Sequence, residues 1–220
     1  MKRSFIVTVA VLVLSAGIAS AEIHIVPPGL SEGDPYRLVF LTSSKMTAQS
    51  TDIAVYNAFV DGVAKSTNSF LKSIDTTWTA IASTSSVSAI NNTNTPTSTT
   101  DIPIYLIDGN KVADNYADLW DGSIDHIINW TELDNSFERS AVWTGTTLTG
   151  EIMASHALGD ANARYGNSGD LDNCWIASSD TSTSLPEYFY GISGVLVVPE
   201  PATLALLSLG GLAMLRRRKR

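Results

Sequence analysis

The chain has 220 residues, 14 of them basic and 22 acidic, and its formal net charge is −8. Half of the basic residues lie in the first 21 and last 22 positions, so that residues 22–198 hold 7 basic and 21 acidic residues and a formal charge of −14. Such an acidic region lacks the basic surface that nucleic-acid binding requires, and we expect no nucleic-acid partner. The single cysteine, Cys174, excludes an intrachain disulfide, so a hydrophobic core has to hold the fold.

The first 21 residues have the pattern of a signal peptide. Two basic residues precede an apolar run, and Ala19 and Ala21 form a small-x-small cleavage site. We therefore expect a signal peptidase to cleave before Glu22, which leaves residues 22–198 as one exported domain.

Within this domain, runs of apolar and β-branched residues predict strands. In chain order these strands are expected at residues 23–26, 36–42, 77–81, 102–106, 140–144, 173–177 and 188–198. Helical spacing of apolar residues predicts one main amphipathic helix, capped by Thr51 and ending near Ala64, and a short helix over 115–120. The polar stretch 83–100 and the glycine-containing stretch 156–173 are expected to be long loops. This order predicts an α+β domain with a largely antiparallel sheet.

The last 22 residues combine three features. A Pro-Glu-Pro tripeptide comes first, a 14-residue apolar run over 202–215 follows, and five basic residues close the chain. As a helix the run would measure about 21 Å, against about 30 Å for the hydrocarbon core of a bilayer. This predicts a short transmembrane helix with its basic end in the cytoplasm and the upstream domain outside.

These three features together resemble the PEP C-terminal (PEP-CTERM) sorting signal of exopolysaccharide-producing Gram-negative bacteria. The residues that carry the resemblance are Pro199, Glu200, Pro201, Arg216, Arg217 and Arg218. The resemblance implies an inner-membrane intermediate, cleavage near the tripeptide by an exosortase, which is a membrane cysteine peptidase, and delivery to the envelope or the extracellular matrix. An ordinary C-terminal anchor is the alternative, with the same orientation and no processing step.

The middle domain also resembles the C-type-lectin-like fold of the collagen-derived endostatin domain. The resemblance lies in the order of its amphipathic helix and of segments 77–80, 102–105, 119–122, 142–145, 174–175 and 188–198. It implies a scaffold for binding more than for catalysis, although the disulfides expected of that family are missing.

No catalytic constellation stands out in the sequence. His24, His126 and His156 do not form a metal-binding spacing, and neither a nucleophile elbow nor a phosphate loop occurs. Cys174, beside Trp175, is expected to be a buried thiol and not a nucleophile. We therefore expect a protein that is not an enzyme, while a secreted hydrolase with two facing carboxylates remains an alternative.

Two kinds of binding residue are candidates. Calcium needs six to eight oxygen ligands, and clustered carboxylates that could supply part of them are Asp121, Asp125, Asp170 and Asp172. No other cofactor is indicated. Three tryptophans, at 78, 143 and 175, are expected in the core, whereas Trp130 lies in a polar segment and is the candidate for stacking on a sugar.

These observations favour an exported envelope or matrix protein that an exosortase processes and that has a structural or binding role, with exopolysaccharide as a candidate partner. The alternatives are a lectin-like module that binds carbohydrate or calcium, and the secreted hydrolase.

Overall fold

The computed structural model describes residues 26–99 and 101–200. Its main sheet has the strand order β3-β10-β1-β4-β5, and β11 extends the pairing of β1. The strands are β1 (Pro35–Leu41), β3 (Trp78–Ala80), β4 (Ile104–Leu106), β5 (Lys111–Ala113), β10 (Tyr190–Ser193) and β11 (Leu196–Val197). Every pair in this sheet is antiparallel except β1 with β4. The expected α+β class with a largely antiparallel sheet is confirmed.

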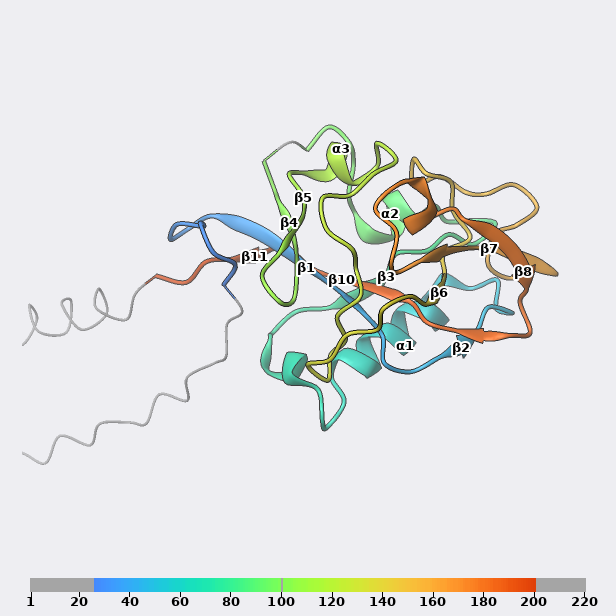
Figure 1. Ribbon diagram of the computed structural model, residues 1–220, viewed down its shortest axis with the longest axis horizontal. Coiled ribbons are helices and arrows are strands. Elements are labelled where there is room, and N and C mark those ends of the chain that lie inside the picture. Colours follow the sequence, from blue (N-terminus) through green and yellow to red (C-terminus); the bar gives the residue numbers. More distant parts are fainter. Residues whose placement is uncertain (1–25, 100, 201–220) are drawn as a thin grey trace, which may run out of the picture.

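Strand β1 is the centre of the domain because both of its faces are buried. Tyr36, Leu38 and Phe40 contribute to one core cluster, and Val39 and Leu41 contribute to the other. A strand covered on both faces reads as a nearly continuous apolar run, as this segment does. Figure 1 shows β1 running between helix α1 on one side and helix α3 on the other.

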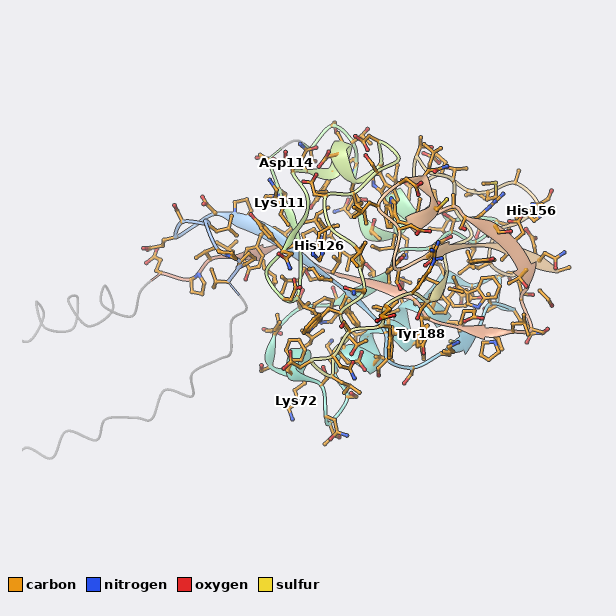
Figure 2. All side chains as sticks on the ribbon, in the orientation of Figure 1. Lys72, Lys111, Asp114, His126, His156 and Tyr188 are labelled. Atoms are coloured by element: carbon orange, nitrogen blue, oxygen red, sulfur yellow. The ribbon has the colours of Figure 1, made fainter. Side chains whose placement is uncertain are left out.

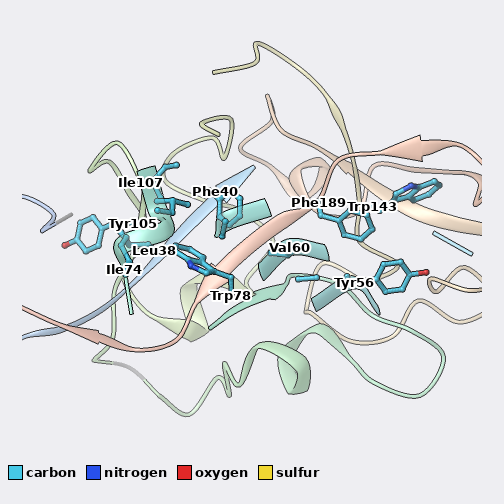
Figure 3. Packing of buried hydrophobic residues seen from close by; sticks show 14 of the residues in the cluster. Leu38, Phe40, Tyr56, Val60, Ile74, Trp78, Tyr105, Ile107, Trp143 and Phe189 are labelled. Carbon is cyan, nitrogen blue, oxygen red and sulfur yellow. The ribbon is translucent and has the colours of Figure 1, made fainter. Parts of the chain in front are cut away.

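Helix α1 (Ile53–Ala64) covers the first face with the apolar stripe that its sequence predicted. Asp52, not Thr51, caps it, because its carboxylate accepts a hydrogen bond from the N–H of Ala54 at 2.9 Å. Below this helix, Phe40 meets Trp78 edge to face with ring centroids 5.1 Å apart. Figure 3 shows these rings together with Val60 of α1 in the same cluster.

The second face is covered by two short helices, α2 (Ala89–Thr93) and α3 (Tyr116–Leu119), and by large aromatic side chains. Asn115 caps α3 by accepting from the N–H groups of Ala117 and Asp118. Trp120 and Trp175 stack in this cluster with centroids 6.3 Å apart. The short helix expected over 115–120 is confirmed, as are the core positions of the tryptophans at 78, 143 and 175.

Two smaller sheets complete the domain. One contains β6 (Ala141–Trp143), β7 (Asn162–Asn167) and β8 (Ser179–Ser182), and the other pairs β2 (Met46–Thr47) with β9 (Pro186–Glu187). Single 3₁₀ turns occur at η1 (Phe70–Ser73) and η2 (Asn173–Trp175).

Three further expectations about local structure were wrong. The stretch 156–173 is not loop alone, since β7 is the middle strand of its sheet; Gly166 lets it approach η2, where an added Cβ would lie 2.0 Å from the Trp175 carbonyl oxygen. The predicted strand over 173–177 is instead η2 followed by a turn, because the Asp172 carboxylate accepts from the N–H of Cys174 and caps a helical turn.

The third error is the polar stretch 83–100, which contains helix α2 and lies partly in the core. Its buried hydroxyl groups have partners there: Ser83 Oγ accepts from the N–H of Ala89 at 2.8 Å, and Thr93 Oγ1 donates to the carbonyl of Ala89 at 2.7 Å. Polar composition alone suggested solvent exposure, but a hydroxyl with hydrogen-bond partners is tolerated in a protein interior.

Within 26–99 and 101–200, no helix has the length and apolar character needed to cross a bilayer. The expected signal peptide, with Ala19 and Ala21, lies outside the described residues, as do Pro201, the apolar run 202–215 and the cluster with Arg216, Arg217 and Arg218.

Candidate functional site

The Pro-Glu-Pro tripeptide begins one residue after the fold ends. Val198 is buried and hydrogen-bonded to the residues that precede β1. Its N–H donates to the carbonyl of Asp34 at 3.0 Å, and its carbonyl accepts from the N–H of Gly33 at 3.1 Å. Pro199 and Glu200 are exposed and have no regular secondary structure. The first two residues of the tripeptide therefore leave the folded domain in a form that a processing enzyme can reach.

A groove of about 610 Å³ runs along α1, and we call it the α1 groove. Its apolar part comes from Ala58, Phe59, Gly62 and Val63 of the helix and from Leu133. Hydroxyl and amide side chains form the rest of its lining: Ser43, Ser44, Ser66, Thr67 and Asn68. Leu133 is 41% exposed and Phe59 is half-buried, so both present apolar surface to the groove. Such a mixture suits a ligand with an apolar face and several hydroxyl groups.

Glu132 is the only carboxylate among the described residues that line the α1 groove. The residue is only 2% exposed. Its carboxylate accepts hydrogen bonds from the N–H of Ser43 at 2.9 Å and from the Ser43 hydroxyl. These bonds fix the carboxylate against the end of β1. No sequence motif indicated this pair, because the two residues are 89 positions apart.

Trp130, the predicted sugar-stacking residue, lies two residues before Glu132. It is half-buried, whereas the other four tryptophans of the chain are buried. Its indole N–H donates to Asp134 Oδ1 at 3.3 Å, and its ring packs against both core clusters. The partial exposure agrees with the expectation, and the proposed stacking on a sugar stays a prediction.

The aspartates proposed as calcium ligands are only partly brought together. Asp170 and Asp172 lie with Cys174 in a group whose ligand atoms are within 4.8 Å of one another. Asp170 Oδ2, however, accepts from Arg139 Nη2 at 2.8 Å, and Asp172 Oδ1 caps η2. The thiol is a soft ligand that calcium does not favour.

Asp121 and Asp125 are not members of this group, although their loop touches it through the Ile124 N–H, which donates to the Leu171 carbonyl at 2.8 Å. Calcium binding at these four aspartates stays a prediction. Cys174 itself is half-buried and not buried as expected. Burial and the neighbouring Asp172 carboxylate raise the pKa of its thiol, which keeps it in the less reactive protonated form.

The described histidines do not converge. Figure 2 shows His126 and His156 in separate parts of the domain. His126 Nδ1 lies 3.0 Å from the Ile127 carbonyl, and His156 Nε2 lies 3.7 Å from Asp180 Oδ2. His24 lies outside the described residues.

Comparison with protein families gives one match: the model of the PEP-CTERM protein-sorting motif covers residues 197–220. The chain carries a PEP-CTERM sorting motif. The match begins in the last strand, β11, and includes the exposed Pro199 and Glu200. A comparison with curated proteins finds no match.

The PEP-CTERM motif marks this chain as an exported protein that an exosortase processes, with passage through the membrane during sorting. This confirms the expected export and exosortase processing. The motif covers the end of the chain and not the folded domain before it. The resemblance of that domain to the C-type-lectin-like fold is not supported by these findings.

Proposed function

We propose that the exported domain is a non-enzymatic binding protein of the cell envelope or extracellular matrix, and that its α1 groove holds a segment of neutral polysaccharide. Signal peptidase would release its N-terminus and exosortase its C-terminus. The observation that carries the proposal is the composition of the groove, whose apolar helix face is bordered by neutral hydroxyl and amide groups on a PEP-CTERM protein.

Sugars offer these two kinds of surface. Their C–H faces pack on apolar or aromatic side chains, and their hydroxyl groups exchange hydrogen bonds with Ser, Thr and Asn. A neutral polymer also fits the −14 charge of residues 22–198 better than a polyanion does, because like charges repel at contact.

Affinity electrophoresis of the full chain in gels containing the host exopolysaccharide tests the groove. Asn68 is exposed in the groove, and its side chain has no hydrogen bond within the described part of the chain. Asn68→Ala should therefore leave the fold intact and weaken retention several-fold, the effect of about one lost hydrogen bond. Asn162→Ala is the matched control, because Asn162 is an exposed asparagine on β7 outside the groove.

Trp130→Ala forms a second arm of this experiment. If the indole stacks on the polymer, the variant loses retention while its circular dichroism stays that of a folded protein. The same gels run with calcium and with a chelator report whether Asp170 and Asp172 contribute. Equal retention of the wild type and Asn68→Ala would contradict binding in the α1 groove, and equal retention of the wild type and Trp130→Ala would contradict stacking on Trp130.

A further inference from the structure

In the part of the chain that the structure describes, Arg37 is a buried cation without an acidic partner. The described residues contain seven basic side chains, and five of them lie within 4 Å of a carboxylate. Of the other two, Lys72 is exposed, whereas Arg37 is only 4% exposed. Buried charges are normally paired, because moving an ion out of water is costly. In a domain with 21 acidic residues, this unpaired arginine requires an explanation.

The neighbours of Arg37 hold its guanidinium in place without neutralising it. Nε donates to the Ser193 carbonyl at 2.6 Å, and Nη1 donates to the Thr93 carbonyl at 2.7 Å. The group also lies over the Tyr116 ring, 5.6 Å from its centroid. Burial lowers the pKa of the guanidinium, and the nearby Tyr116 partly offsets this effect. An arginine nevertheless stays charged in proteins.

Two of the three guanidinium nitrogens thus donate to backbone carbonyls, and the Tyr116 side chain is a further polar neighbour of the group, but no carboxylate of the described residues lies within 4 Å of it. A guanidinium has five N–H groups in a planar fork, which matches two oxygens of a carboxylate or sulfate. The guanidinium of Arg37 is therefore fixed in orientation but has no anionic partner for its fork among the described residues.

Arg37 also lines a cavity of about 220 Å³ at the end of strands β1, β3 and β10. The cavity opens to solvent between exposed residues, among them Thr77, Asn94 and Val195. Thr79 lines it as well, and its hydroxyl is a buried atom without a hydrogen-bond partner. Six other buried side-chain atoms of the described residues are in the same state, so this hydroxyl points to a ligand only because it lies beside the same cavity as Arg37.

We propose that this cavity binds one oxyanion, a carboxylate or sulfate group, between the Arg37 guanidinium and the Thr79 hydroxyl. The anion neutralises the buried charge and accepts the hydrogen bond that Thr79 cannot make within the domain. The volume suits a small acid or one acidic sugar residue and is below the usual range for larger ligands. The cavity shares no lining residue with the α1 groove, so the two proposals succeed or fail separately.

Calorimetric titration of the full chain with glucuronate at constant ionic strength tests the site, with glucose as the neutral control. We expect saturable binding of glucuronate and none of glucose. Thr79→Val should weaken this binding about tenfold, since a hydrogen bond to a charged group is lost. Because the Thr79 hydroxyl has no partner in the domain, this variant should stay folded.

Thr181→Val is the matched control, since Thr181 is a half-buried strand threonine in β8, outside the cavity. Arg37→Lys keeps the charge and removes the fork, so glucuronate binding should be weaker than in the wild type. Equal affinity of the wild type, Thr79→Val and Arg37→Lys would overturn the proposal, as would a folded wild type that does not bind glucuronate.

Competition with an acidic polysaccharide then identifies the source of the anion. A polymer that displaces glucuronate shows that the site binds an acidic sugar residue within a polysaccharide. A polymer that fails to displace glucuronate shows that the site binds a free small acid. Either result supports an oxyanion site at Arg37.

Discussion

Single side chains in this domain connect distant parts of the chain where a disulfide is absent. The Tyr190 hydroxyl donates to the Trp175 carbonyl at 3.1 Å, and the Thr144 hydroxyl donates to the Ile176 carbonyl at 2.7 Å. The first bond holds the segment around η2 against β10, and the second holds it against the residue that follows β6. Because the groups are buried, removing one partner leaves the other unsatisfied, at a cost of about 1–3 kcal/mol.

Buried tyrosines make the stability of the domain sensitive to alkaline pH. Burial raises the pKa of Tyr56 from 10.0 to about 12, and burial also raises the pKa of Tyr36 and Tyr190. The folded state thus holds the phenolic protons more tightly than the unfolded state does. The free energy of unfolding should be constant with respect to Tyr56 below pH 10 and fall as pH rises through about 12.

Urea unfolding at pH 8, 10 and 11 measures this loss. Tyr56→Phe removes one of the titrating groups and should make the decrease less steep. The variant should also be less stable at pH 8 by about 1 kcal/mol, because the Tyr56 hydroxyl donates to the Ser50 carbonyl at 2.7 Å. A decrease between pH 8 and 11 that is identical in the two proteins would show that Tyr56 does not contribute.

At the scale of elements, helix α1 has two roles: it covers one face of the main sheet, and it forms one wall of the α1 groove. Gly62 lies inside this helix, and a Cβ added there would meet no atom within 4 Å. Packing therefore does not require glycine, although glycine lowers helix stability by about 0.5–1 kcal/mol relative to alanine. Gly62 also lines the α1 groove, where the missing methyl group leaves room for a ligand.

Gly62→Ala should accordingly raise the free energy of unfolding by about 0.5–1 kcal/mol and weaken retention on the polysaccharide. Val55→Ala is the control, because Val55 is an exposed residue of α1 outside the groove, and alanine there also favours the helix. Urea unfolding and affinity electrophoresis of both variants separate the two effects. If Gly62→Ala is retained as well as Val55→Ala, the groove does not hold the polymer.

Sequence periodicity predicted the elements that bury apolar side chains. Strand β1 was found as a nearly continuous apolar run and helix α1 by the helical spacing of its apolar residues. Helix α2 was missed because Ser, Thr and Asn dominate residues 83–100, and strand β7 was missed because glycines recur in residues 156–173. The site at Arg37 was missed because its two carbonyl partners are 56 and 156 residues away in the sequence.

At the scale of the whole molecule, the tail and the domain meet at a sharply defined boundary. The domain is closed by the bonds between Val198 and residues 33–34, and the sorting motif overlaps it only at its last strand. Cleavage after Val198 would therefore remove no residue of the core. It would also remove five basic residues, so the released domain would be more acidic than the full chain.

This boundary leads to a prediction for a host that contains an exosortase. Mass spectrometry of the surface-associated protein should find chains that begin near Glu22 and end near Pro199-Glu200-Pro201, because the tripeptide is exposed beyond a folded domain that resists proteolysis. In a host that lacks the exosortase, the same chain should keep its basic C-terminus and remain with the membrane fraction. Surface-associated protein that still ends at Arg220 would contradict processing, and the tail would then act as an ordinary anchor.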